Sequence, residues 1–388
     1  MFRQITSEKL YPIDTVSCPV APLSVCQASP DHSQIAKLRQ RSQGRALFTK
    51  KIVFVIGAGA SRDYNFPLGS ELKDQISRAV RFRFQHGSML VNGSQELLDH
   101  IRRHIKDPNS QSKMQRVDEY TRAANKLANA APLFVSIDEA LHFVSDLKEA
   151  VDVGKLAIIE SILRAERAST LAFNKANGRP ELPDGWIAEV LSMALAGLQR
   201  KDLATCFASV TFVNFNYDRA IEQYLYWALQ ERTGATADEA LAIVTSLDML
   251  RPYGSIGQFS PKIDSEFAFG ADCYFDPFTR LATLGTYTDR TPMHDQARMA
   301  AALQSAELVV FLGFGYHPSN MNVISQPGPK GKAQVIGTAL GIHERNHSAI
   351  ITRIADDLVI PTDSIAIENM KATDLLRDLR PQILMRVG

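Results

Sequence analysis

Continuous apolar runs mark the chain at several well-separated places. Short runs rich in Val, Ile, Phe and Leu are typical of strands that are buried on both faces of a parallel sheet. The clearest strands are expected at 51–56, 209–215, 306–312 and 333–337, with shorter candidates at 247–252 and 364–367.

Between the first two strands the apolar residues change to the i, i+3, i+4 spacing of helices. Helices are expected there at 117–130, 137–149, 155–177 and 186–200. The second of these follows Ser136 and carries Asp138 and Glu139 in its first turn, which is the pattern of a helix start. Further helices are expected between and after the later strands, at 220–230, 237–246, 294–304, 349–357 and 373–379.

The alternation of strands and helices predicts an α/β fold with a doubly wound, Rossmann-like parallel sheet and helices on both faces. We expect one main domain over 46–388, with a large helical insertion or subdomain over 70–205. Residues 1–45 mix Pro, Ser, Asp and Arg with little periodicity, so they are predicted to be an extension outside the core.

Composition narrows the functional classes. The chain has 388 residues and a formal net charge of +1, which gives no global attraction to nucleic acid or to an anionic membrane. The apolar runs are too short to span a membrane, so a cytoplasmic protein is expected. The cysteines are widely spaced and form no C-x-x-C pair, so no metal site is predicted. They are Cys18, Cys26, Cys206 and Cys273.

The first expected strand ends in a turn of small residues, Gly57, Ala58, Gly59, Ala60 and Ser61. Such a turn lets the backbone approach a ligand, and N–H groups at the following helix start can meet a pyrophosphate. A turn of this kind can also serve only to pack a helix on a strand. Alone, the motif is therefore weak evidence for a dinucleotide site.

Two more turns follow expected strands. Phe215, Asn216 and Asp218 come after the strand at 209–215, where ligands bind in open α/β sheets. The alternative is that Asn216 or Asp218 caps the next helix. The third turn contains Tyr253, Gly254 and Ser255, and it could be an ordinary Pro-Gly turn.

The fourth turn follows the strand at 306–312 and contains Gly313, Phe314, Gly315, His317 and Asn320. The glycines allow backbone N–H groups to approach a ligand. A histidine that precedes a proline is more often a loop residue than a catalyst. The carboxyl ends of parallel strands share one edge of a sheet, so these turns together predict a ligand site at that edge.

In this order and at these separations, the four motifs resemble the sirtuin fold. More narrowly, they resemble the sirtuin-like NAD hydrolases of bacterial anti-phage defence, over about residues 51–345. The resemblance implies NAD+ as substrate, with the pyrophosphate held at Gly57–Ser61. It also implies that Asn216 positions the ribose and the attacking water, and that Asp218 faces the nicotinamide carboxamide.

The resemblance further implies a homo-oligomer, with residues 1–45 as an assembly arm, and a trigger protein. That partner could be a HerA-type translocating ATPase or another nucleic-acid-handling protein. The chain departs from the family at two points. It lacks the four-cysteine zinc module of the deacylases, and Tyr253 stands where the family has the histidine of a His-Gly pair.

A phenol is a poor general base at neutral pH. Tyr253 is therefore a substituted base, a binding contact beside a relocated base such as His317, or the mark of a weak enzyme. We expect an NAD+ hydrolase that releases nicotinamide and ADP-ribose. The alternative is a catalytically weak scaffold or sensor that binds NAD or ADP-ribose.

Two other enzyme classes fit less well. A Rossmann dehydrogenase would need an acidic residue about 20 positions after the glycines, at the end of a second strand. Glu71 and Asp74 lie too early and on an expected helix. A nuclease would need carboxylates that hold Mg²⁺, and the sequence nominates none.

Overall fold

A computed structural model describes residues 48–86, 89–271, 277–285, 293–325 and 331–387. These residues belong to one compact unit, Gln43–Gly388. The prediction for residues 1–45 lies outside the described residues.

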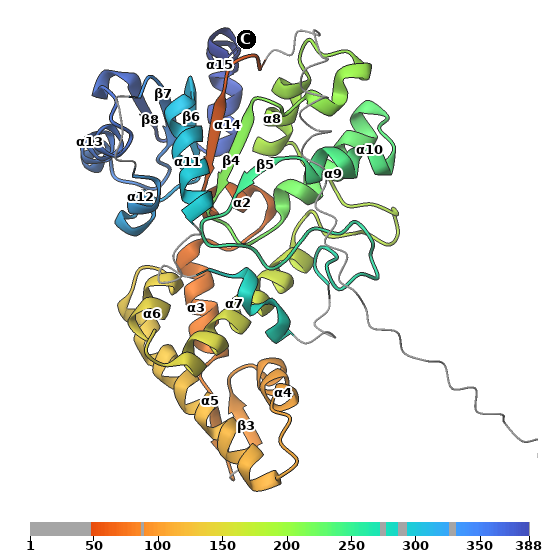
Figure 1. The fold of residues 1–388 in the computed structure, drawn as a ribbon, viewed down its shortest axis with the longest axis vertical. Helices are drawn as coiled ribbons and strands as arrows, with labels where there is room; N and C mark the ends of the chain where they lie inside the picture. The colour runs from red at the N-terminus through yellow and green to blue at the C-terminus, as the bar shows by residue number, and fades with distance from the viewer. Residues whose placement is uncertain (1–47, 87–88, 272–276, 286–292, 326–330, 388) are drawn as a thin grey trace, which may run out of the picture. The chain divides into compact units, whose positions relative to one another are not determined.

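Six parallel strands form the central sheet, in the order β5-β4-β1-β6-β7-β8 (Figure 1). All six expected strands are therefore confirmed, and so is the doubly wound α/β class. Their bounds are β1 Ile52–Ile56, β4 Val210–Asn214, β5 Asp248–Leu250, β6 Leu308–Leu312, β7 Gln334–Thr338 and β8 Ile365–Glu368.

The strand order reverses at β1. The chain first moves outward on one side, through β4 to β5, and then returns to the other side of β1 with β6. Ile56 pairs with both Asn214 and Leu312, so the carboxyl ends of the three central strands lie level. Such a reversal leaves a crevice at the carboxyl edge, because the connections on the two sides diverge.

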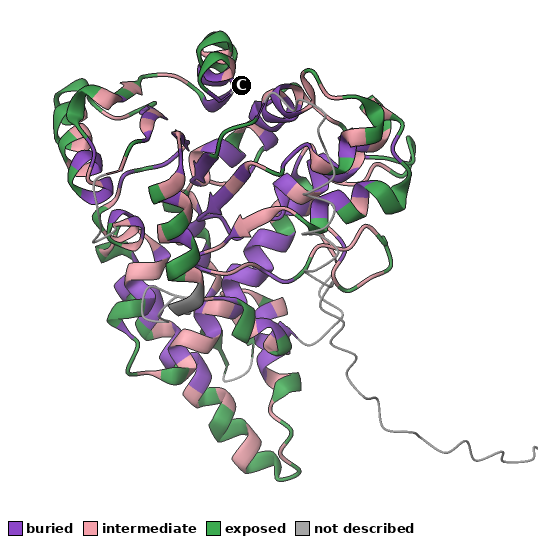
Figure 2. Cartoon of the chain, turned by 45° about the horizontal axis from the view of Figure 1, so that its top comes forward, coloured by how far each residue is buried: buried purple, intermediate pink, exposed green. Residues whose placement is uncertain are grey.

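Side chains of alternate residues in β1 enter two separate cores. Val53 and Val55 pack on one side of the sheet, and Ile52, Phe54 and Ile56 pack on the other. Strand alternation with both faces apolar explains why the sequence shows a continuous run. Figure 2 shows these central strands buried beneath helices whose outer faces are exposed.

The first core receives helices from the segment between β1 and β4 and from the segments after β5. They are α3 Gly69–Ala79, α4 Gln95–His104, α5 Ser110–Ala130, α6 Ile137–Phe143, α7 Lys148–Ala168, α11 Met293–Ser305, α12 Pro318–Ile324 and α13 His347–Leu358. The second core receives the remaining long helices. They are α8 Trp186–Leu195, α9 Ala220–Thr233, α10 Ala237–Thr245, α14 Ala372–Asp378 and α15 Arg380–Val387.

Several boundaries differ from the prediction. The helix expected at 137–149 ends at Phe143, and α7 begins after a short turn at Lys148. The helix expected at 155–177 already ends at Ala168. The insertion also contains an antiparallel hairpin that was not predicted, β2 Arg83–Gln85 with β3 Met89–Asn92. None of the helices in the described ranges is long and apolar enough to cross a membrane.

Candidate active site

A cavity of about 810 Å³ opens at the carboxyl edge of the sheet, where the strand order reverses. This volume lies within the usual range of pockets that enclose small molecules. The turns after β1, β4, β6 and β7 line it, together with the segment that precedes α14. Residues 135–138, at the start of α6, close one side.

Most of the predicted site residues meet in this cavity. Its wall contains Gly57, Ala58, Gly59, Phe215, Asn216, Asp218, Tyr253, Gly313, Phe314, Gly315, His317 and Asn320. Ala60 and Ser61 lie just beneath the wall and are buried. Gly254 and Ser255 lie outside it, in a turn that pairs with Thr283–Gly285.

The two glycine turns are in direct backbone contact. The Gly57 N–H donates to Leu312 O at 3.0 Å, and the Gly59 N–H donates to Gly313 O at 2.9 Å. These N–H groups are therefore not available to a ligand. Ala58, Phe314 and Gly315 also line the cavity, and their N–H groups have no hydrogen-bond partner among the described residues.

A hydrogen-bonded triad of side chains joins the turn after β4 to the short helix after β1, α2 Ala58–Ser61. Asn216 Nδ2 donates to Ser61 Oγ at 2.9 Å and to Gly57 O at 3.1 Å. Ser61 Oγ in turn donates to Asp218 Oδ2 at 3.0 Å. Both Asn216 N–H bonds point into the protein, and no described residue donates to the Asn216 amide oxygen.

Asp218 Oδ1 also accepts the N–H of Ala220, the first residue of α9, at 3.1 Å. The N-cap residue of α9 is Arg219, without a side-chain capping hydrogen bond, so neither Asn216 nor Asp218 is the N-cap. Asp218 is only 4% exposed, and this burial raises the pKa of its carboxyl to about 6. Arg251 fixes the turn by donating to the carbonyl oxygens of Asn216 at 2.8 Å and Asp218 at 3.0 Å.

Tyr253 is buried, and its hydroxyl donates to Asn320 Oδ1 at 2.8 Å. Its ring packs edge-on against Phe215, with the ring centroids 5.6 Å apart. Phe215 makes a similar contact with Phe314 at 5.1 Å. The three aromatic rings form a continuous wall that joins the turns after β4, β5 and β6.

His317 lines the cavity with 27% of its side chain exposed. Its Nδ1 lies 2.7 Å from Ser319 Oγ and 3.5 Å from Glu139 Oε1. The proline that follows begins α12, so His317 is held in a short turn between β6 and that helix. This places His317 beside α6.

The same helix carries an acid that sequence reasoning did not nominate as a site residue. Asp138 lines the cavity, and its Oδ1 accepts a hydrogen bond from the hydroxyl of Tyr217. Burial raises the pKa of the Asp138 carboxyl to about 6. In the sequence, Asp138 follows a capping serine, and Ser136 Oγ does accept the Glu139 N–H at 3.2 Å. The helix-start pattern explained the acidic residue at position 138, so no feature of the sequence placed Asp138 in the cavity.

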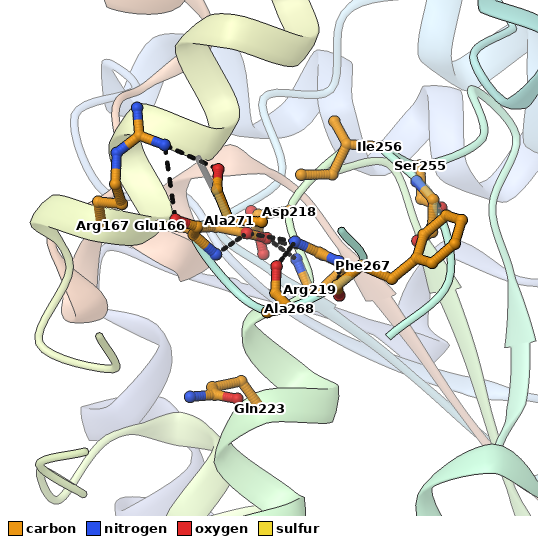
Figure 3. Close-up of polar contacts among 12 residues, drawn as sticks. Glu166, Arg167, Asp218, Arg219, Gln223, Ser255, Ile256, Phe267, Ala268 and Ala271 are labelled. Atoms are coloured by element: carbon orange, nitrogen blue, oxygen red, sulfur yellow. Dashed lines mark hydrogen bonds and ion pairs between the residues drawn. The ribbon is translucent and has the colours of Figure 1, made fainter. Parts of the chain in front are cut away.

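A buried ion pair supports the turn after β4 from below (Figure 3). Arg219 and Glu166 are both fully buried, and Arg219 Nη2 lies 2.5 Å from Glu166 Oε2. Arg219 also donates to the carbonyl oxygens of Phe267 at 2.6 Å and Ala268 at 2.9 Å. The pair therefore connects the end of α7, the start of α9 and the segment around 267–268.

The described part of the chain contains no group of three or more His, Cys, Asp or Glu side chains arranged to hold a metal ion. Cys206 is buried in the second core, and burial raises the pKa of its thiol to about 12. Cys18, Cys26 and Cys273 lie outside the described residues.

No protein-family model matches the chain, and no curated protein sequence matches it. The crystal structure of a Sir2 homologue in complex with NAD matches with a TM-score of 0.37 and 12% sequence identity, covering 88% of this chain and 93% of that chain. The chain is structurally similar to Sir2 homologues.

A second match is a mutant of Sir2 homologues in complex with 2'-O-acetyl ADP-ribose, with a TM-score of 0.36 and 11% identity. This match covers 92% of the present chain and 98% of the other.

Proposed function

We propose that the protein is an NAD+ glycohydrolase that cleaves the bond between nicotinamide and ribose. The observation that carries this proposal is the hydrogen-bonded triad of Asn216, Ser61 and Asp218. Asn216 and Asp218 line a cavity at the reversal point of a parallel sheet, and the buried Ser61 joins them. The order of the four turn motifs, which resembles the sirtuin-like NAD hydrolases, supports the same assignment.

The cavity offers separate surfaces for the parts of NAD+. The backbone N–H groups of Ala58, Phe314 and Gly315 are suited to the pyrophosphate, because they have no other partner among the described residues. The wall formed by Phe215, Tyr253 and Phe314 is suited to a flat aromatic ring. We assign the nicotinamide to the end of the cavity that also contains Asn216 and Asp218.

Cleavage of a glycosidic bond passes through an oxocarbenium-like transition state. Nicotinamide leaves as a neutral molecule from a cationic pyridinium, so the leaving group needs little acid assistance. The protein must orient the ribose, support its positive charge and place a water molecule. The open amide oxygen of Asn216 can bind the ribose or the water, and the Asp218 carboxylate can support the positive charge and bind the carboxamide.

The test is chromatography of the products that the purified chain makes from NAD+. We expect nicotinamide and ADP-ribose in equal amounts, and we expect Asn216→Ala to lower their release by at least about 100-fold. Asn322→Ala is a matched control, because Asn322 is exposed on α12 and its Oδ1 accepts a hydrogen bond from Arg353 at 2.6 Å. Unchanged release by a folded Asn216→Ala protein would contradict the proposal.

A second candidate function is a scaffold or sensor that binds NAD or ADP-ribose with little turnover. The Tyr253–Asn320 hydrogen bond favours it, because the Tyr253 hydroxyl acts there as a donor and not as a base. Calorimetric binding of NAD+ without nicotinamide release would support the sensor. A large gain in turnover in Tyr253→His would then show that the site lacks only a base.

The resemblance of the four motifs to sirtuin-like defence proteins also supports a proposal about the protein's role in the cell. We propose a cytoplasmic, homo-oligomeric effector that depletes NAD+ in bacterial anti-phage defence when a HerA-type ATPase or another trigger protein releases it. Residues 1–45 are proposed as the assembly arm. Light scattering of the chain without residues 1–45 tests the assembly arm, since a smaller assembly would support it and an unchanged assembly would contradict it.

A fall in cellular NAD+ during phage challenge would support the defence role.

A further inference from the structure

The start of α6 brings a carboxylate into the cavity beside the residues proposed to cleave NAD+. We propose that Asp138 is the general base that takes the proton from the attacking water. This inference rests on the proposed NAD+ hydrolysis. Asp138 would supply the general base that Tyr253 does not, since the Tyr253 hydroxyl donates a hydrogen bond to Asn320.

The hydrogen bond from Tyr217 locates Asp138 with respect to the triad. Tyr217 is the residue between Asn216 and Asp218, and its hydroxyl donates to Asp138 Oδ1. This hydrogen bond joins the start of α6 to the turn after β4, and Asp138 lines the same cavity as Asn216 and Asp218, the two residues proposed to bind the ribose and the nicotinamide. α6 belongs to the segment between β1 and β4, so the insertion would complete the active site.

The other acid in the cavity is less available. Asp218 is 4% exposed, and each of its carboxylate oxygens already accepts a hydrogen bond, one from Ser61 and one from Ala220. Asp138 is half-buried, and within the described residues it accepts only from Tyr217 and from its own backbone. A water molecule in the cavity can therefore reach the Asp138 carboxylate.

His317 is the competing base, but its position favours Asp138. His317 belongs to the turn after β6, and its Nδ1 is occupied by Ser319 and Glu139. Neither of these partners belongs to the turn after β4, which carries Asn216 and Asp218. Glu139 neighbours Asp138 on α6, so the two acids of this helix contact two different turns, Asp138 the turn after β4 and Glu139 the turn after β6.

The titration of Asp138 suits a base at neutral pH. Burial and the nearby charge of Glu139 raise its pKa, and the hydrogen bond from Tyr217 lowers it, which gives a value of about 6. On α3, the charged Lys73 donates to Phe134 O, three residues before the start of α6, at 2.9 Å. A carboxylate with a pKa near the working pH is ionised and yet accepts protons better than an ordinary one.

In the proposed step, the C1'–N bond of the nicotinamide ribose breaks, and its electron pair goes to the nicotinamide nitrogen. The water oxygen forms the new bond to C1', and the Asp138 carboxylate takes one water proton. That proton then passes to solvent, which leaves nicotinamide, ADP-ribose and the original carboxylate.

The test is the pH dependence of kcat for NAD+ cleavage in the full chain and in Asp138→Asn. The wild type should lose activity as the pH falls through about 6, because Asp138 becomes protonated. Asp138→Asn should lower kcat by about 10²–10⁴-fold, with calorimetric NAD+ affinity retained. Asp146→Asn, in the exposed turn after α6, is the matched control and should keep the wild-type kcat and pH profile.

Two further variants separate catalysis from a structural role. Tyr217→Phe removes a hydrogen bond that lowers the pKa of Asp138, so the acidic limb should move to higher pH. His317→Gln should keep the limb at about pH 6. An unchanged profile in Asp138→Asn, or a limb that disappears in His317→Gln, would overturn the assignment to Asp138 while leaving NAD+ hydrolysis standing. Absence of nicotinamide release by the wild type would instead overturn both proposals.

Discussion

The backbone N–H of Gly59 donates to the carbonyl oxygen of Gly313 at 2.9 Å, across the point where the sheet reverses. Gly313 has φ +56°, and a Cβ on it would lie 1.8 Å from the backbone nitrogen of Ala60. The backbones of the turns after β1 and β6 are thus in direct contact, with no side chain between them. This contact sets the floor of the cavity, because any side chain at Gly313 would separate the two turns.

Gly313→Ala should therefore destabilise the protein strongly. The control is Gly341→Ala, since Gly341 also has a positive φ of +80° but a Cβ added to it would meet no atom within 4 Å. In both variants an alanine must adopt a left-handed backbone conformation, which is unfavourable. Only in Gly313→Ala does the new Cβ also clash with backbone atoms, which cannot move aside. We expect Gly313→Ala to lose roughly 1–3 kcal/mol more in urea unfolding than the control. Equal losses would contradict the close contact.

Burial of Asp218 should appear as a pH-dependent cost to stability. Its folded pKa of about 6 lies above the ordinary 3.8, so the folded state holds this proton more tightly than the unfolded chain does. The resulting stabilisation is present below about pH 4 and is lost as the pH rises through 6.

Asp218→Asn lacks this titration and serves as the reference. Between about pH 4 and pH 7, the unfolding free energy of the wild type should fall by roughly 2–3 kcal/mol relative to the variant. The titration of Asp138 is common to both proteins and cancels in the difference. Parallel stability curves for the two proteins would show that the Asp218 carboxyl titrates normally.

The Arg219–Glu166 pair should be costly to break on either side. Glu166→Gln leaves the Arg219 charge buried without a counter-charge and should cost about 3–5 kcal/mol. Glu307→Gln, in an exposed pair with Lys332, should cost less than about 1 kcal/mol.

Urea unfolding of Glu166→Met, Arg219→Met and the double variant tests whether the two side chains interact. The double variant should lose less unfolding free energy than the sum of the losses of the two single variants. Additive losses would mean that the two side chains act independently.

The sheet could be predicted because its strands are apolar on both faces. Val53 and Phe54 enter different cores, so β1 has no polar side to interrupt the run. The β2–β3 hairpin could not be predicted in this way. Its strands, such as Arg83–Gln85, are short and exposed, and they carry no burial pattern.

The site could be predicted only where its residues follow a strand. Asn216, Asp218 and Gly313 stand directly after β4 or β6, and the topology of a doubly wound sheet brings those positions together. Asp138 and Glu166 could not be found by that reasoning. Each lies on a helix and meets its partner from the turn after β4 by tertiary packing across many residues, so no local pattern records the contact.

The most direct test of NAD+ cleavage at this site is a crystal structure of the Asn216→Ala protein with NAD+. We predict intact NAD+ in the cavity, with the pyrophosphate at the N–H groups of Ala58, Phe314 and Gly315. The nicotinamide ribose should lie between residue 216 and the Asp138 carboxylate. NAD+ bound outside the cavity, or bound with its adenine at residue 216, would contradict the account.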